Sequence, residues 1–206
     1  MAYFSDTNGG NDTTPANPAA ANYAPLQQLQ TGLANNTVAR YNWITPDQFN
    51  DMHTTLAAGF TDPRTGIHYT GDAGRIAQGD YFLSVLVPEI MSSVAYQNNG
   101  AIVIWNDETE GGDTSAFTNT EIVLSPLAKG NAYASDVSYT HSSDPLTYQR
   151  VFGVGPCLGA ACTANDLSDL FVAGAIPNAT TVPEPALMAL LGAGLLGVAA
   201  ARRRRA

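Results

Sequence analysis

The sequence is poor in basic residues, with nine lysines and arginines against 18 acidic residues in a chain of 206. Four of the nine form the run from Arg202 to Arg205, so residues 1–183 hold five basic residues against 17 acidic ones. A surface with this excess of negative charge repels phosphate backbones and anionic lipid headgroups. The composition therefore argues against nucleic acid as a specific partner, and it is compatible with divalent cations.

Charged residues of either sign make up only 13% of the chain, and it contains two cysteines, Cys157 and Cys162. Low charge with abundant glycine is typical of a loop-rich, exported domain. The spacing in CLGAAC fits neither a CxxC redox pair nor a zinc knuckle. In an exported protein we expect a local disulfide between the two cysteines, with two free thiols as the alternative.

A recognisable N-terminal export signal is also missing. Residues 1–21 are polar, without the basic region and apolar core of such a signal, and they are typical of a flexible lead-in. Because an exported domain needs a signal, we expect the natural N-terminus to lie upstream of Met1. The remaining chain is long enough for one domain at 22–176, followed by a separate C-terminal segment at 177–206.

The C-terminal segment contains the one long apolar run, residues 186–201, between VPEP and RRRR. As a helix it would be about 24 Å long, close to the thickness of a bilayer core, with the arginines on the cytoplasmic side. The order of these parts resembles the PEP-CTERM sorting signal of Gram-negative bacteria. That resemblance implies a transient anchor in the inner membrane, cleavage by an exosortase near Pro183-Glu184-Pro185, and a location in the cell envelope or outside the cell. A plain C-terminal membrane anchor is the alternative.

Periodicity predicts helices that alternate with short buried strands, and therefore an α/β domain with a mostly parallel sheet. Ligands of such sheets bind beyond the carboxyl ends of the strands. The first predicted elements are an amphipathic helix at 23–33, a strand at 40–45, a helix that begins after the N-cap Thr45 and ends near His53, and a loop at 54–71. A helix at 80–98, divided by Pro88, and buried strands at 101–105 and 121–124 follow. The last predicted elements are a helix capped by Ser143 and stopped by Gly153, and a short helix at 165–171.

Two adjacent acids, Asp107 and Glu108, directly follow the predicted strand at 101–105. Neighbouring carboxylates repel each other, so a bound cation favours keeping both ionised. Their oxygen atoms suit Mg²⁺, Ca²⁺ or Mn²⁺, and a nearby imidazole such as His53 or His141 would also suit Zn²⁺. A divalent metal ion with imidazoles at the carboxyl ends of the strands is suited to catalyse phosphoester hydrolysis. The alternative is a solvated turn with structural histidines.

Five blocks of the chain, over roughly residues 22–175, resemble the bacterial phosphoesterase family, which includes acid phosphatases and phosphatidylcholine-type phospholipases C. The family belongs to the alkaline-phosphatase superfamily. The blocks are YNWITPDQFNDMH, GDYFLSVLVPEIMSSVAYQNNGAIVIWNDE, IVLSPLAKG, YTHSSDPLTYQRVFG and NDLSDLF, in that order.

The resemblance implies a three-layer α/β/α sandwich of alkaline-phosphatase type and a phosphate mono- or diester as substrate. It implies that Asp107 and Glu108 ligate the metal, that His53 faces the phosphoryl group with Asp51 beside it, and that His141 lines the site. The family's early part, with its first metal ligands and its Ser or Thr nucleophile, has no counterpart here, so we expect only the C-terminal part of the sandwich. A non-catalytic, cation-binding envelope or matrix protein on the same scaffold is the alternative function.

Overall fold

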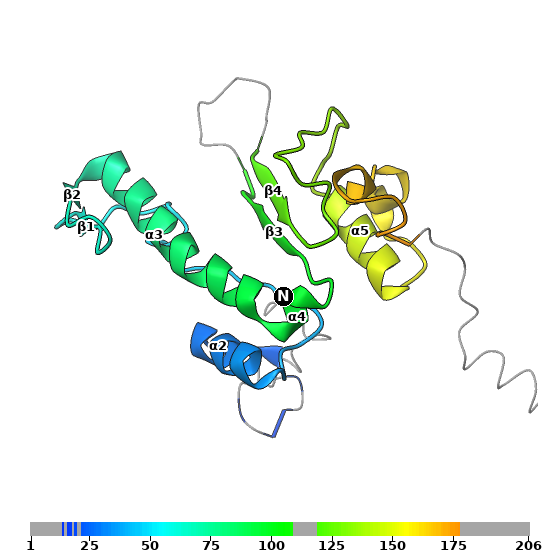
Figure 1. The fold of residues 1–206 in the computed structure, drawn as a ribbon, viewed down its shortest axis with the longest axis horizontal. Coiled ribbons are helices and arrows are strands. Elements are labelled where there is room, and N and C mark those ends of the chain that lie inside the picture. The colour runs from blue at the N-terminus through cyan, green and yellow to red at the C-terminus, as the bar shows by residue number, and fades with distance from the viewer. Residues whose placement is uncertain (1–13, 15, 18, 20–21, 109–118, 178–206) are drawn as a thin grey trace, which may run out of the picture. The chain divides into compact units, whose positions relative to one another are not determined.

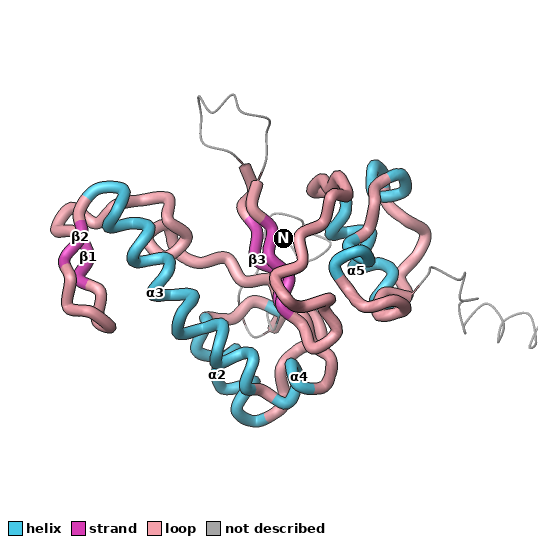
Figure 2. Tube along the Cα trace, turned by 45° about the horizontal axis from the view of Figure 1, so that its top comes forward, coloured by secondary structure: helices cyan, strands magenta, loops and turns pink. Residues whose placement is uncertain are grey.

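The computed structural model describes residues 14, 16–17, 19, 22–108 and 119–177 (Figure 1). The chain divides into two compact units, Met1–Ala101 and Ile102–Ala206. Both mix helices with short strands, as Figure 2 shows by colour. The domain boundaries expected at 21/22 and 176/177 stay predictions.

The first unit begins with the helix α2, Leu26–Asn35, which confirms the helix predicted from the leucine spacing. Its C-cap, Asn36, has the left-handed conformation, with φ 55°, and its N–H donates to the carbonyl oxygens of Gly32 and Leu33. Asparagine tolerates this conformation better than most residues, so the helix ends there. Leu33 is the buried residue of the helix.

The segment after α2 differs from the prediction. Residues 40–45 form no strand; within this segment the Trp43 indole N–H donates to the Thr45 hydroxyl at 2.9 Å. Residues 47–53 form turns instead of a helix. The Asp47 carboxylate accepts hydrogen bonds from the N–H groups of Asn50 and Phe49, which lower its pKa. These side-chain bonds give the backbone an alternative to helical bonds, which explains why the capping sequence does not start a helix here.

The loop predicted at 54–71 contains a small antiparallel hairpin of β1, Phe60–Thr61, and β2, His68–Tyr69. An ion-pair network closes its turn, because Arg64 pairs with Asp62 at 2.7 Å and with Asp80 at 2.6 Å. Asp62 is 4% exposed. The Arg64 guanidinium lowers the pKa of Asp62, so this buried carboxyl stays ionised.

The long helix α3, Gly71–Ser92, begins well before the predicted start at Asp80 and runs through Pro88 without interruption. It ends at Ser93, whose hydroxyl caps the short helix α4, Val94–Gln97, by accepting from the Tyr96 N–H. The division of the predicted helix therefore falls at Ser93 and not at Pro88. A serine side chain at an N-cap satisfies a free N–H group of the next helix, which stabilises the break at this point.

The second unit begins with a hairpin of β3, Ile102–Trp105, and β4, Glu121–Leu124. The strands are antiparallel, with Trp105 opposite Glu121, so the prediction of a mostly parallel sheet is wrong for these strands. Every residue of β3 is partly exposed, and so are those of β4, with Ile122 the most exposed at 46%, so the prediction of fully buried strands is also wrong. A two-stranded ribbon leaves part of both faces open to solvent.

The rest of the second unit packs around α5, Ser143–Phe152, which confirms the predicted helix and its stop at Gly153. Two 3₁₀ helices follow, η2 at Gly159–Thr163 and η3 at Leu167–Leu170. The latter confirms the short helix predicted at 165–171, in the 3₁₀ form. Leu167 is fully buried, and its N–H donates to the Thr147 hydroxyl of α5 at 2.9 Å. The Cys157–Cys162 disulfide confirms the expected pairing.

The fold shown is therefore mixed α/β, with two small antiparallel sheets and no three-layer sandwich in the described residues. The predicted apolar helix at 186–201 lies outside these residues. Within the part of the chain that the structure describes, no helix is long and apolar enough to cross a membrane.

Candidate functional site

The turn at 47–53 presents the first two predicted site residues, Asp51 and His53, both exposed. Asp51 accepts a hydrogen bond from the His53 backbone N–H at 2.8 Å, and the His53 carbonyl oxygen accepts one from Arg75 of α3 at 3.2 Å. Both bonds hold the backbone of His53, whose side chain makes no contact that fixes its ring in the described residues. Asp51 thus fixes the turn that carries His53.

A glycine of α3 provides space for this turn. Met52 has a left-handed backbone, with φ 71°, and its side chain lies against Gly79. A Cβ at Gly79 would come within 2.4 Å of Met52 Cγ, so an alanine there would displace the turn. The position of His53 therefore depends on a small residue in the neighbouring helix.

The acidic pair Asp107 and Glu108 directly follows β3, as the sequence indicates. Both residues lie in a bend and are exposed. The preceding residue, Asn106, is held by its carbonyl oxygen, which accepts a hydrogen bond from the Asn119 side chain at 3.2 Å. The strand end is thus anchored, and the two carboxylates project from it into water.

His141 lies just before α5 and is exposed, with its ring against Trp105, the last residue of β3. The ring centroids are 5.4 Å apart and the planes are inclined by 58°. The turn that carries His141 is stabilised by the fully buried Ser143, whose hydroxyl accepts from the Thr140 N–H at 3.0 Å. The structure therefore brings His141 to the strand after which Asp107 and Glu108 follow.

The predicted site residues are divided between the two units. Asp51 and His53 belong to the first unit, and Asp107, Glu108 and His141 belong to the second. No group of three or more His, Cys, Asp or Glu that could hold a metal ion occurs in the described residues. Two adjacent carboxylates therefore do not form an all-protein metal cage, although they fit a water-rich Mg²⁺ site, since this ion is often held by one or two carboxylates.

His68, the third histidine, has a structural position. Its Nδ1 lies 2.9 Å from the Thr61 hydroxyl across the β1–β2 hairpin. The ring also lies beside Gly59, where a Cβ would come within 2.7 Å of its Nε2. His68 therefore stabilises the small hairpin.

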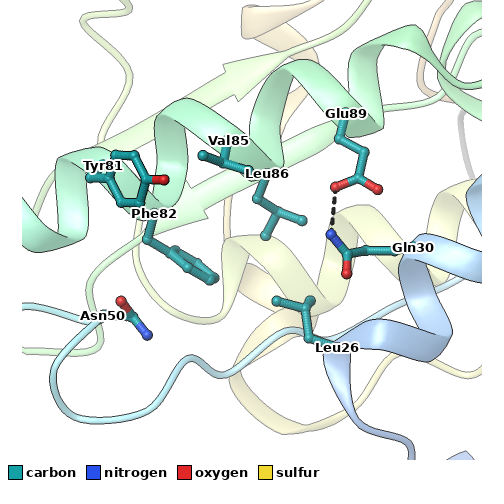
Figure 3. Close-up of a pocket in the computed structure, with 8 residues that line it drawn as sticks. All are labelled: Leu26, Gln30, Asn50, Tyr81, Phe82, Val85, Leu86 and Glu89. Carbon is teal, nitrogen blue, oxygen red and sulfur yellow. Dashed lines mark hydrogen bonds between the residues drawn. The ribbon is translucent and has the colours of Figure 1, made fainter. Parts of the chain in front are cut away.

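Each of the two units has a hollow in its described surface. The first, of about 180 Å³, lies between α2 and α3 and is lined by Leu26, Phe82 and Leu86, with the Gln30–Glu89 hydrogen bond of 2.9 Å at its edge (Figure 3). The second, of about 410 Å³, lies beside η3. Neither is lined by a predicted site residue, and the first is smaller than typical ligand pockets.

Sequence analysis missed a pair of carboxyl groups in the second unit, Glu121 of β4 and Asp144 of α5. Asp144 is 5% exposed, and the Oε1 atom of Glu121 is buried without a hydrogen-bond partner. Burial, and then the charge of Asp144, raises the pKa of Glu121 to about 7. Glu121 stands at the start of a strand that the sequence predicted to be fully buried. This position is the signal that could have revealed the carboxyl pair.

A second missed group surrounds Asp169 of η3. Its carboxylate accepts hydrogen bonds from Lys129, Ser135 and Tyr133, at 2.8, 2.6 and 2.8 Å. The Lys129, Ser135 and Tyr133 bonds lower the pKa of Asp169 to about 2. Because all three hydrogen bonds join η3 to the segment before α5, this group stabilises the packing of η3 against that segment.

Comparison with known families identifies one segment of the chain. Residues 181–205 match the PEP-CTERM protein-sorting motif. The motif implies that the protein is exported and sorted to the cell surface through processing by an exosortase. No curated protein and no solved structure matches the chain.

Proposed function

We propose that this cell-surface protein is a phosphoesterase that hydrolyses phosphate mono- or diesters with the help of a divalent metal ion. The observation that carries the proposal is the contact between His141 and Trp105. The contact joins His141 to the strand that precedes Asp107 and Glu108. His141 and this strand belong to two blocks that lie far apart in the sequence, and both blocks resemble phosphoesterase motifs. The order of the five resembling blocks adds further support.

Asp107 and Glu108 are the proposed ligands of the metal ion. Their exposure leaves room for water and for phosphate oxygens in the remaining coordination positions, which is how Mg²⁺ is commonly held. When bound, the ion would neutralise the charge that develops on the phosphoryl oxygens.

His141 is the proposed proton donor, because it lies in the same unit as Asp107 and Glu108; the catalytic role expected of His53, in the other unit, stays a prediction. An exposed imidazole is accessible to a bound substrate without a change of fold, and imidazole is the side chain most often used as a general acid. Asp51 acts as a positioning residue, since its carboxylate holds the His53 backbone.

The first test is hydrolysis of p-nitrophenyl phosphate in Mg²⁺, with and without a chelator, by the protein as the producing cell makes it, since the family's Ser or Thr nucleophile has no counterpart in residues 1–206. We expect chelation and Asp107→Ala each to lower turnover about 100-fold or more, because the charge on the phosphoryl group is then left unneutralised. Asp136→Ala is the matched control, since Asp136 is an exposed carboxylate elsewhere in the second unit. Turnover that is unaffected by Asp107→Ala would exclude the metal assignment.

The alternative function is a non-catalytic envelope or matrix protein that binds cations. It is favoured by the exposure of Asp107 and Glu108, which leaves both carboxylates accessible to cations from the medium. Calorimetry with Mg²⁺ and Ca²⁺ distinguishes the two functions. Cation binding that Asp107→Ala abolishes, without hydrolysis of any phosphate ester, would support the alternative, whereas chelator-sensitive hydrolysis supports the phosphoesterase.

A further inference from the structure

The face of the β3–β4 hairpin that carries Glu121 meets the segment before α5. Glu121 lies directly opposite Trp105 in the antiparallel pair, so their side chains share one face. The Trp105 ring contacts His141, and Asp144 follows three residues later in the first turn of α5. The beginning of α5 therefore lies against the face that holds Glu121.

Two carboxyl groups with few hydrogen-bond donors flank this contact, and they lie near enough for the charge of Asp144 to raise the pKa of Glu121. Glu121 Oε1 is buried and has no partner in the described structure, whereas Asp144 accepts one hydrogen bond, from the Tyr148 hydroxyl at 3.0 Å. Two ionised carboxylates in such a place repel each other and lose hydration. A proton on one of the two carboxylates removes the repulsion between them and the cost of burying that charge.

We propose that Glu121 and Asp144 hold one proton between them, and that this proton fixes the His141 segment on the β3–β4 hairpin in acidic to neutral medium and releases it as the pH rises. The inference does not depend on the proposed phosphoesterase activity, since it concerns the attachment of α5 to the hairpin. A protein at the cell surface meets the external pH directly, so this contact would respond to it.

The proton belongs on Glu121. The charge of Asp144 is favoured by the N-terminus of α5, by the Tyr148 hydroxyl and by the nearby His141, and Glu121 has no such support. Burial, then the negative charge of Asp144, raises the pKa of Glu121 to about 7. Burial also raises the pKa of Asp144, although Tyr148 and His141 partly offset it.

The other elements around Glu121 contribute one further titratable group. Tyr139, in the segment before α5, has its pKa raised by burial first and also by the charges of Asp169 and Glu121. Within β3, Ile102–Trp105, every side chain is uncharged. Among the described residues, the carboxyl pair, His141, Tyr139 and Tyr148 therefore contribute to the charge around Glu121.

The direction of the pH effect follows from the raised pKa of Glu121. Its contribution to stability is fully present below the ordinary value of 4.5 and declines as the pH rises, until it is lost above about 7. Over this window the folded unit holds a proton that the unfolded chain has released. The equilibrium constant for unfolding should therefore rise by up to about tenfold per pH unit.

The test is urea unfolding of the full chain between pH 4.5 and 8.5, followed by tryptophan fluorescence. The chain has two tryptophans, so a Trp43→Phe background leaves Trp105 as the reporter of the second unit. We expect Glu121→Gln, which replaces the carboxyl with a neutral group of the same shape, to remove most of the pH dependence and to unfold at higher urea than the parent above pH 7. The same slope in the parent and in Glu121→Gln would overturn the proposal.

Asp136→Asn is the matched control and should keep the pH dependence of the parent, since Asp136 is exposed. If Glu121→Gln does not fold, the parent protein itself supplies the answer through a ¹³C NMR titration of the assigned Glu121 carboxyl. A midpoint near 7 is expected, and a midpoint near the ordinary 4.5 would overturn the proposal.

Discussion

At the scale of single residues, the acidic side chains of this protein differ by the donors around them. Asp169 receives three hydrogen bonds from Lys129, Tyr133 and Ser135, which keep it charged. Glu121 Oε1 receives none from the described residues, and burial raises its pKa. Donors lower a carboxyl pKa and burial raises it, so the two residues should respond to pH in opposite directions.

Asp169→Asn tests the first of these cases. The depressed pKa of Asp169, about 2 against an ordinary 3.8, means that its contribution to stability is present above the ordinary value and is lost as the pH falls through about 2. We expect Asp169→Asn to lower the thermal midpoint of the second unit at pH 7 and to reduce the further loss between pH 4 and 2. Thermal unfolding followed by circular dichroism measures both effects, and equal midpoints for the parent and the variant at pH 7 would contradict them.

At the scale of secondary-structure elements, the sequence predicted the helices whose start, spacing or end depends on neighbouring residues alone. The leucine spacing gave α2, and Gly153 ends α5 because its left-handed backbone, with φ 64°, suits glycine. The strand and the helix predicted around Thr45 did not form. A strand needs a partner, which propensity cannot supply, and the Asp47 carboxylate binds the N–H groups that a helix would have used.

The antiparallel pairing of β3 and β4 had a sequence signal that the α/β interpretation overlooked. Parallel neighbours need a crossover connection, which is usually a helix. The segment between the strands contains Gly111-Gly112 and no helical period of apolar residues. The candidate residues Asp107, Glu108 and His141 were found from their types and spacing, but the ring contact between His141 and Trp105 depends on tertiary structure.

Gly153→Ala tests the end of α5. An added Cβ meets no atom within 4 Å, so the only cost is the left-handed backbone, about 1–2 kcal/mol in the free energy of unfolding. Gly153→Asn is the control, since asparagine adopts this conformation more readily and should lose less. Urea unfolding followed by Trp105 fluorescence gives both values, and a larger loss for asparagine than for alanine would contradict the capping role.

At the scale of the whole molecule, the negative charge and the sorting motif agree on where the protein works. Residues 181–205 imply export and exosortase processing, and an acidic surface suits a medium that supplies divalent cations. The membrane-spanning role expected of residues 186–201 stays a prediction, because these residues lie outside the described structure.

Deletion of residues 182–206 tests the sorting motif in the producing cell. We expect the shortened chain to be absent from the cell surface, because the exosortase has no motif to recognise. Replacement of Pro183-Glu184-Pro185 by alanines should block processing while the apolar run is kept. Surface labelling and the mass of the recovered chain measure both effects, and normal surface amounts of the deleted form would refute the assignment.

The bond between Cys157 and Cys162 makes the thiols of this chain a reporter of compartment. Reducing enzymes keep cysteines free in the cytoplasm, whereas they pair once a protein has left it. Molecules retained inside the cell should therefore take up two alkyl groups from a thiol reagent, and translocated molecules none. Because the chain has no other cysteine, the mass of the alkylated protein would report how much of it has been exported.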